Sequence, residues 1–264
     1  MKKEVKNLNQ ICITQTAATV LALLGITPTG QMAPPIQQVL DHQSSCDRIF
    51  IYNPDAVAMW IYEKYVDYFK EMVEKIDLKL PMLSVIPPVT PVCFGSMYSG
   101  LLPAEHGIQK YEKPILTVPT IFDLLPQAGK KAAIVSTEGD SISKIFLNRK
   151  IDYYIYPSKE TCNKKALELI EQDHYDLIVL YNGDYDYQMH RHTPEGKKAL
   201  KALQENISTF KLLQASIQKY WSAHQSALIF APDHGCHRVC GFLGNHGKNL
   251  PCDMNIMHFY SFIR

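Results

Sequence analysis

The stretch Asp176-Leu-Ile-Val-Leu-Tyr181-Asn-Gly-Asp-Tyr-Asp186 decides how this chain is expected to fold. It begins with a short apolar run, which predicts a β-strand, and acidic side chains follow where that strand ends. Six more runs of β-branched, aliphatic and aromatic residues recur along the chain: Arg48–Tyr52, Met82–Ile86, Ala132–Ser136, Tyr153–Tyr156, Ala227–Ala231 and Met257–Ile263. Because longer amphipathic segments separate these runs, the pattern indicates an α/β fold with a mostly parallel central sheet.

Two of the intervening segments have helical periodicity. One follows Asp55 and repeats its apolar residues at steps of three and four: Val57, Ile61, Tyr65, Tyr68, Met72 and Ile76. The other is predicted to begin at Thr193, a capping residue followed by Pro194 in the first turn and by Glu195. Its buried stripe is expected to comprise Ala199, Leu203, Ile207, Phe210, Leu213, Ile217 and Trp221. Helices on both faces of the sheet would make a three-layer α/β/α sandwich.

The composition is that of an ordinary globular protein. The 264 residues are 46% hydrophobic, which is ample for a sizeable core. No linker, repeat or charge block divides the chain, so residues 1–264 are predicted to form a single domain. Lys and Arg total 27 against 26 for Asp and Glu, so no net field exists to hold a nucleic acid polymer or a membrane. We therefore expect neither a nucleic acid polymer nor a membrane as a partner, and the sequence does not indicate the oligomeric state.

Seven cysteines, an odd and scattered set, predict free thiols and a cytoplasmic location. Cys236 and Cys240 lack a second matching pair and are not expected to form a structural zinc site. Export is the alternative to the cytoplasm, because lysines precede an apolar stretch over residues 11–26 in roughly the layout of a secretory signal. That stretch has polar interruptions and no clear cleavage site, and it is too short to span a bilayer.

Potential metal ligands follow four of the predicted strands. In sheets of this kind, ligands gather at the carboxyl ends of the strands. The polar residues at these positions are Asp55, Thr90, Asp184, Asp186, Asp233 and His234. Five of the ten histidines, at positions 190, 192, 234, 237 and 246, are interleaved with them. Imidazole with carboxylate suits zinc or manganese better than calcium or magnesium, so the repetition indicates a metal site.

Four motifs resemble the alkaline-phosphatase superfamily, in particular its type I phosphodiesterase/nucleotide pyrophosphatase branch. Pro88-Val-Thr-Pro-Val-Cys-Phe-Gly-Ser-Met-Tyr-Ser-Gly-Leu-Leu-Pro-Ala-Glu-His-Gly-Ile108 is similar to the segment that carries the threonine nucleophile. The other three are Asp186-Tyr-Gln-Met-His190, Pro232-Asp-His-Gly235 and Gly244-Asn-His-Gly247. Their common order between Asp55 and His246 is specific, whereas no single motif would be.

The resemblance implies an alkaline-phosphatase-like sandwich with Thr90 as nucleophile and two divalent metal ions, zinc with manganese as the alternative. One ion would be held by Asp186, His190 and His246. The other would be held by Asp55, Asp233, His234 and the Thr90 oxygen. Asp184 and His192 are the alternatives to Asp186 and His190. The implied function is a phosphodiesterase or nucleotide pyrophosphatase that acts on a small phosphate ester.

Departures from the family pattern keep other functions open. Ala56 stands where the family often has glycine, and Met189 replaces the glycine before the ligating histidine. Cys93 replaces an asparagine that would bind a phosphoryl oxygen, and a thiol is a weaker donor. The alternatives are a phosphomonoesterase, a phosphonate hydrolase or a catalytically weak metal-binding homologue. Residues 16–26 also resemble a helix that relatives carry near the C-terminus, which predicts an altered chain order.

Overall fold

The computed structural model describes residues 8–239, 241 and 243–263, and one large sheet runs through them. The sheet has eight strands in the order β1-β3-β10-β7-β2-β6-β4-β5. β10 is antiparallel to both of its neighbours and the other pairs are parallel, so the predicted mostly parallel sheet is confirmed. The strands are β1 (Ile11–Cys12), β2 (Arg48–Pro54), β3 (Leu78–Leu83), β4 (Ala132–Thr137), β5 (Asp152–Tyr156), β6 (Leu177–Asn182), β7 (Ser226–Phe230) and β10 (Asn255–Ile263). A separate hairpin pairs β8 (His237–Arg238) with β9 (Gly244–Asn245).

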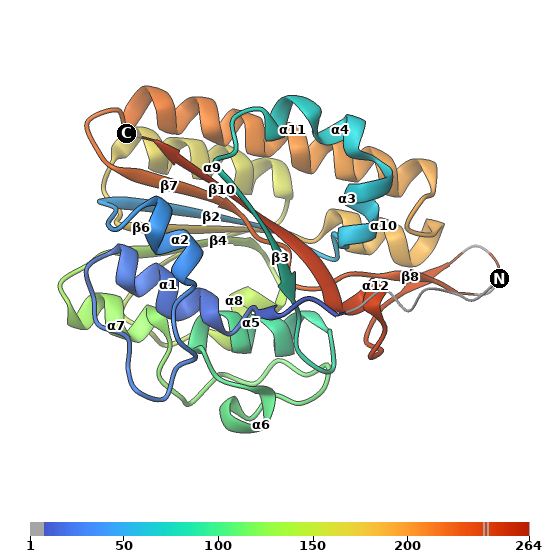
Figure 1. Ribbon diagram of the computed structural model, residues 1–264, viewed down its shortest axis with the longest axis horizontal. Helices are drawn as coiled ribbons and strands as arrows, with labels where there is room; N and C mark the ends of the chain where they lie inside the picture. Colours follow the sequence, from blue (N-terminus) through green and yellow to red (C-terminus); the bar gives the residue numbers. More distant parts are fainter. Residues whose placement is uncertain (1–7, 240, 242, 264) are drawn as a thin grey trace.

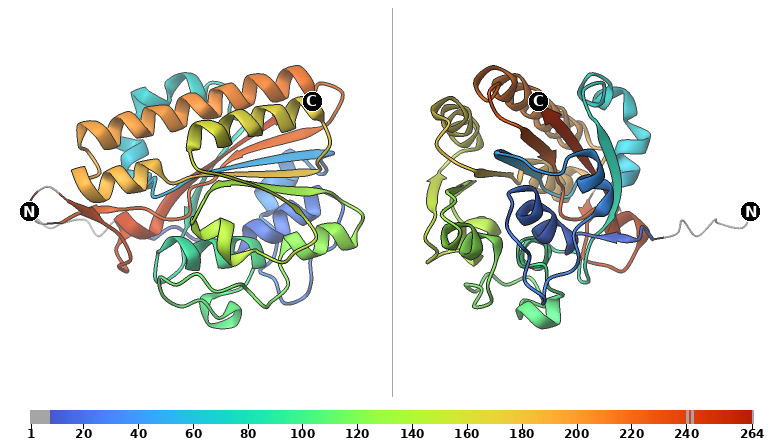
Figure 2. Two further views of the ribbon diagram at one scale, coloured as in Figure 1. Left: turned by 180° about the vertical axis from the view of Figure 1, so that it is seen from behind. Right: turned by 60° about the vertical axis from the view of Figure 1, so that its left-hand side comes forward.

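Helices cover both faces of the sheet, so the predicted three-layer α/β/α sandwich is confirmed (Figures 1 and 2). One layer contains α1 (Gln15–Leu23), α2 (Gln37–His42), α5 (Thr90–Ser99), α6 (Pro103–His106), α7 (Ile121–Gln127) and α8 (Ser141–Ile145). The opposite layer contains α3 (Met59–Lys64), α4 (Val66–Val73), α9 (Lys159–Gln172), α10 (Asp184–His192) and α11 (Lys197–Tyr220). A short helix, α12 (Pro251–Met254), precedes β10.

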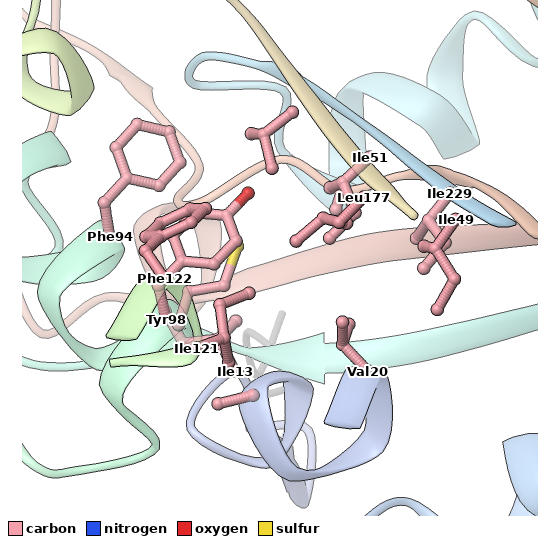
Figure 3. Packing of buried hydrophobic residues seen from close by; sticks show 14 of the residues in the cluster. Ile13, Val20, Ile49, Ile51, Phe94, Tyr98, Ile121, Phe122, Leu177 and Ile229 are labelled. Atoms are coloured by element: carbon pink, nitrogen blue, oxygen red, sulfur yellow. The ribbon is translucent and has the colours of Figure 1, made fainter. Parts of the chain in front are cut away.

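The alternation of side chains along β2 shows why both faces need a cover. Ile49 and Ile51 belong to the hydrophobic cluster that includes α1 and α5, and all of their surface is buried (Figure 3). Phe50 and Tyr52 point the other way, into the cluster with α9 and α11. Successive side chains of a strand face opposite sides of the sheet. A strand that is apolar at every position therefore needs a helix layer on each face of the sheet.

Three predicted boundaries were wrong. The strand expected at residues 82–86 is β3, which begins at Leu78 and ends at Leu83. Its first residues do not form an apolar run, because exposed Lys79 and Pro81 alternate with buried Leu80 and Met82. The helix expected over residues 57–76 is interrupted between α3 and α4 at Tyr65, so Phe69 is buried on α4 and Tyr68 is exposed.

The third wrong boundary is the helix expected to begin at Thr193. It begins at Lys197 with Gly196 as its cap, because Thr193 has a positive φ and ends α10 instead. The predicted stripe of this helix from Ala199 to Trp221 is confirmed, since all seven residues are buried.

The apolar stretch near the N-terminus forms part of the core. Helix α1 packs against α2, α5 and α7, and Val20, Leu21 and Leu23 are buried. In the part of the chain that the structure describes, no helix is both long and apolar enough to cross a membrane. The six described cysteines are free thiols, as predicted, and Cys240 lies outside the described residues.

A buried histidine makes stability sensitive to acid. His258 is fully buried in β10, its Nε2–H donates to Pro232 O at 2.9 Å, and burial lowers its pKa to about 4. As the pH falls, His258 of the unfolded chain therefore binds a proton near pH 6.5, whereas His258 of the folded chain binds it only near pH 4. Below that pH the free energy of unfolding should fall, until the pH passes about 4. The slope due to His258 should reach about 1.4 kcal/mol per pH unit.

Urea unfolding of metal-free protein between pH 7 and pH 4.5 measures this slope. In His258→Gln, whose amide can still donate to Pro232, the dependence on pH should be shallower than in the unaltered chain. His174 lies on the surface beside Lys131, and His174→Gln is the matched control that should leave the slope unchanged. Equal slopes in all three proteins would contradict the assignment.

Candidate metal centre

Three adjacent parallel strands bring the predicted ligands to one edge of the sheet. β2 lies between β6 and β7, and all three run in the same direction. Asp55 comes directly after β2, Asp233 follows β7, and α10 begins two residues after β6. Because the carboxyl ends of these strands coincide, side chains that are far apart in sequence come together here.

Asp55, Asp233 and His234 form the first cluster, and all three are buried. His234 Nε2 lies 3.2 Å from Asp55 Oδ1 and 3.5 Å from Asp233 Oδ2. The Thr90 hydroxyl donates to Asp55 Oδ2 at 3.2 Å and lies 3.4 Å from His234 Nε2. The structure therefore places Thr90 against the cluster that the sequence assigned to it.

Thr90 is the first of the ten residues of α5, so the N-terminus of this helix lies at the site. Val89 caps the helix in an extended conformation, and Pro91 in the first turn removes an N–H that would have no partner inside the helix. The free backbone N–H groups of a helix N-terminus attract negative charge. An anionic phosphoryl group at Thr90 would benefit from that field.

Asp186, His190 and His246 form the second cluster. Asp186 Oδ1 lies 3.3 Å from His190 Nε2 and 3.4 Å from His246 Nε2. The two clusters adjoin, since the rings of His234 and His246 stack with their centroids 4.0 Å apart. Asp184 points elsewhere: it pairs with Lys159 at 2.5 Å, and neither it nor His192 belongs to a described cluster.

All three histidines of the two clusters are held in the same way. The Nδ1 atoms of His190, His234 and His246 lie 2.9 to 3.1 Å from the backbone carbonyls of Gly244, Gly235 and Pro88. Nδ1–H donates in each bond, so Nε2 is the ring nitrogen that faces the carboxylates and that would bind a metal ion in place of a proton. This is the arrangement that a metal-ligating histidine needs, because the second nitrogen fixes the ring orientation and the tautomer.

Burial leaves the charges of the first cluster poorly balanced. Burial raises the pKa of Asp55 and of Asp233, and the neighbouring carboxylates raise both further. Burial would lower the pKa of His234, but Asp233 and Asp55 outweigh it and raise that pKa to about 9. Burial and the charge on His234 lower the pKa of His246 to about 3, so His246 is a neutral imidazole.

The residues present fit divalent cations. Three carboxylate oxygens are buried without a hydrogen-bond partner: Asp55 Oδ1, Asp186 Oδ1 and Asp233 Oδ2. Buried polar atoms are normally paired, and an unpaired carboxylate oxygen is especially costly. Each of these oxygens faces a histidine Nε2, so a cation between them would satisfy both groups. Carboxylate with imidazole is a donor set that zinc and manganese accept.

Cys93, predicted to bind substrate, is fully buried in α5. Its Sγ lies 3.2 Å from Ser84 Oγ, which donates to Asp233 O at 2.7 Å. The observed contact of Cys93 therefore supports the loop that carries Asp233, and contact with substrate stays a prediction. His106 is buried as well and accepts from Ile108 N at 3.3 Å, so its ring holds the turn that follows α6.

Tyr181 is a site residue that the sequence analysis missed. It occupies β6, and its hydroxyl donates to Asp55 Oδ2, the oxygen that also accepts from Thr90. The signal was present, because Tyr181 is the last residue of the apolar run quoted above. An aromatic residue in such a run predicts a core side chain, and only the hydrogen bond to Asp55 shows that its hydroxyl belongs to the site.

A cavity of about 610 Å³ opens from the two clusters. Thr90, Asp55 and Asp186 line one end of it, and the walls carry both aromatic and cationic groups. Among the described wall residues, the tyrosines are Tyr111, Tyr181 and Tyr187, and the lysines and arginine are Lys113, Lys159 and Arg191. The Arg191 guanidinium stacks on the Tyr187 ring at 4.1 Å. The space suits a small anionic molecule with an aromatic part.

Comparison with known proteins agrees with this fold. No family model matches the chain, and no curated protein matches its sequence. Solved structures do match it, and they define the class of fold as an alkaline-phosphatase-like α/β sandwich, which confirms the resemblance at the level of the fold.

Three of the similar structures are of ectonucleotide pyrophosphatase/phosphodiesterase 5. The murine ectonucleotide pyrophosphatase/phosphodiesterase 5 is 18% identical, with a TM-score of 0.56 over 72% of this chain and 58% of that one. The human protein is 17% identical, with a TM-score of 0.56 over 72% and 57%. An inactive variant of the murine protein in complex with AMP is 16% identical, with a TM-score of 0.55 over 73% and 58%. The chain thus spans less than three fifths of the length of these structures.

Proposed function

We propose that this chain is a metal-dependent phosphodiesterase or nucleotide pyrophosphatase that uses Thr90 as its nucleophile and two divalent ions. The observation that carries the proposal is the position of the Thr90 hydroxyl, within 3.4 Å of both Asp55 and His234. The second cluster adjoins it across the stacked rings of His234 and His246. Zinc is the favoured ion, with manganese as the alternative.

The bound ions would supply Lewis-acid stabilisation of the nucleophile and of the phosphoryl oxygens. Asp55, Asp233 and His234 would hold one ion, and Asp186, His190 and His246 the other. Asp55 Oδ2 accepts the hydrogen bond of Thr90 and so orients its hydroxyl, and both residues line the cavity. Thr90 Oγ1 would attack phosphorus in line with the leaving oxygen and form a phosphothreonine, which water then hydrolyses.

The substrate is proposed to be a small nucleotide-like phosphoester. The exposed rings of Tyr111 and Tyr187 line the cavity and offer faces to an aromatic group. Arg191 and Lys113 add positive charge in the same space. The murine structure in complex with AMP has the same fold, which supports this class of substrate. A cytoplasmic location remains part of the proposal and rests on the free thiols.

Comparing catalytic efficiency on bis-aryl and mono-aryl phosphates tests the reaction. We expect the diester to be preferred, because the lysines and the arginine of the cavity already contact other groups. Lys159 pairs with Asp184 and Glu205, Lys113 donates to Gly139 O, and Arg191 stacks on Tyr187. A monoester carries an additional charge that would require an uncommitted cation. A clear preference for the monoester would favour a phosphomonoesterase, and no turnover of either would favour a metal-binding homologue.

A further inference from the structure

His237, Cys252 and Asp253 form a third cluster of metal-ligand side chains away from Thr90. His237 lies in β8, and Cys252 and Asp253 lie in α12. A ring nitrogen, the thiol sulfur and a carboxylate oxygen of these residues lie within 4.8 Å of one another. None of the three residues belongs to the two clusters described above.

The three side chains converge on one oxygen atom. His237 Nδ1–H donates to Asp253 Oδ1 at 2.7 Å, and Cys252 Sγ lies 3.8 Å from the same oxygen. Asp253 is fully buried, and its other oxygen accepts from Lys248 N at 2.9 Å. His237 Nε2 is buried and has no hydrogen-bond partner among the described residues, which is uncommon for a polar atom.

The donor set matches one divalent ion in charge and in kind. A thiolate, a carboxylate and a neutral imidazole carry two negative charges, so a divalent ion would leave no net charge in this buried place. Thiolate and imidazole ligands select zinc over magnesium and calcium. Three protein ligands leave a fourth position for water. We propose that His237, Cys252 and Asp253 bind a third metal ion, which is zinc.

This site would fix the segment that carries His246. His237 pairs with Asn245 in the β8–β9 hairpin, and His246 follows directly. Asp253 O accepts from Gly235 N at 2.7 Å, so the same helix also holds the end of the Asp233-His234 loop. An ion here would join β8 to α12 and hold both loops in register. It is therefore a positioning site, and none of its three ligands lines the cavity beside Thr90.

Cobalt substitution tests the proposal without any measurement of catalysis. Cobalt bound to a thiolate gives a charge-transfer absorption band, and the two proposed catalytic clusters contain no cysteine. Co²⁺-loaded protein should show this band, and Cys252→Ala should abolish it. Metal content by elemental analysis should fall by one equivalent in the same variant. Cys12→Ala is the matched control, since Cys12 is another half-buried thiol, in β1, and should leave the band and the metal content unchanged.

Further variants separate this site from the catalytic clusters. Asp186→Ala should lose one equivalent of metal and keep the thiolate band, so failure of the proposed function would leave this inference standing. If Cys252→Ala does not fold, His237→Gln keeps the thiol and should still lose the third equivalent. Absence of the band from the unaltered protein would overturn the proposal. So would a band that persists in Cys252→Ala or disappears in Cys93→Ala.

Discussion

Replacing Thr90 by alanine is expected to lower kcat by at least about three orders of magnitude on the best phosphoester substrate, because a nucleophile and its activating groups act as a unit. Tyr181 also donates to Asp55, but of the two hydroxyls Thr90 is the one that lies 3.4 Å from His234 Nε2 as well, so we expect no other group to take its place. Metal content should change little, because six protein ligands remain. Steady-state kinetics with elemental analysis of the same sample measure both quantities.

Two comparison variants make the Thr90 result interpretable. Thr90→Ser keeps a hydroxyl and should retain part of the rate. Thr161→Ala removes a threonine from an exposed position on α9 and should leave kcat unchanged. If Thr90→Ala turned over at nearly the normal rate while Asp186→Ala did not, water would be the attacking group and the covalent route would be wrong.

Removing the divalent ions is expected to abolish activity and to lower Tm by on the order of 10 °C. Three buried carboxylate oxygens have no hydrogen-bond partner: Asp55 Oδ1, Asp186 Oδ1 and Asp233 Oδ2. Their desolvation destabilises the metal-free folded protein, and bound ions would remove that destabilisation. Binding at 1,000 times Kd stabilises the folded state by about 4 kcal/mol. In a chain of this size, each kcal/mol of stabilisation raises Tm by about 2–4 °C. Calorimetry of chelated and zinc-reconstituted protein is the measurement.

Helix α10 offers a matched pair of variants for the metal prediction. Asp186→Asn should lose one equivalent of metal and most of the activity, since Asp186 contacts both His190 and His246. Asp184→Asn changes a carboxylate two residues away that pairs with Lys159, and it should keep the metal. Equal metal content in the two variants, or a Tm that does not respond to zinc, would refute the ligand assignment.

The strand ends were predictable because their signals are local. The apolar runs around Phe50, Val179 and Leu228 identified three central strands, and the polar residue after each one marked the site. The buried stripe of α11 followed from its period in the same way. The bounds of β3 and the break at Tyr65 were not predictable. Pairing with β10 decides where β3 begins and ends. Contacts with α11, in the same helix layer, help to decide which face of α4 is buried.

The sequence by itself determined the order of strands and helices, the types of metal ligand and the segment that presents Thr90, because periodicity and residue chemistry are properties of neighbours in the chain. Only the tertiary structure decided that Asp186 and His190 face His246 while Asp184 pairs with Lys159. Both acidic residues follow β6 and both lie on α10, so the rotation of that helix against the β8–β9 hairpin makes the choice. The same holds for Cys93, whose burial against Ser84 depends on the packing of α5. For Asp184, Asp186 and Cys93, long-range contacts fix which group each side chain faces, and the local pattern does not contain those contacts.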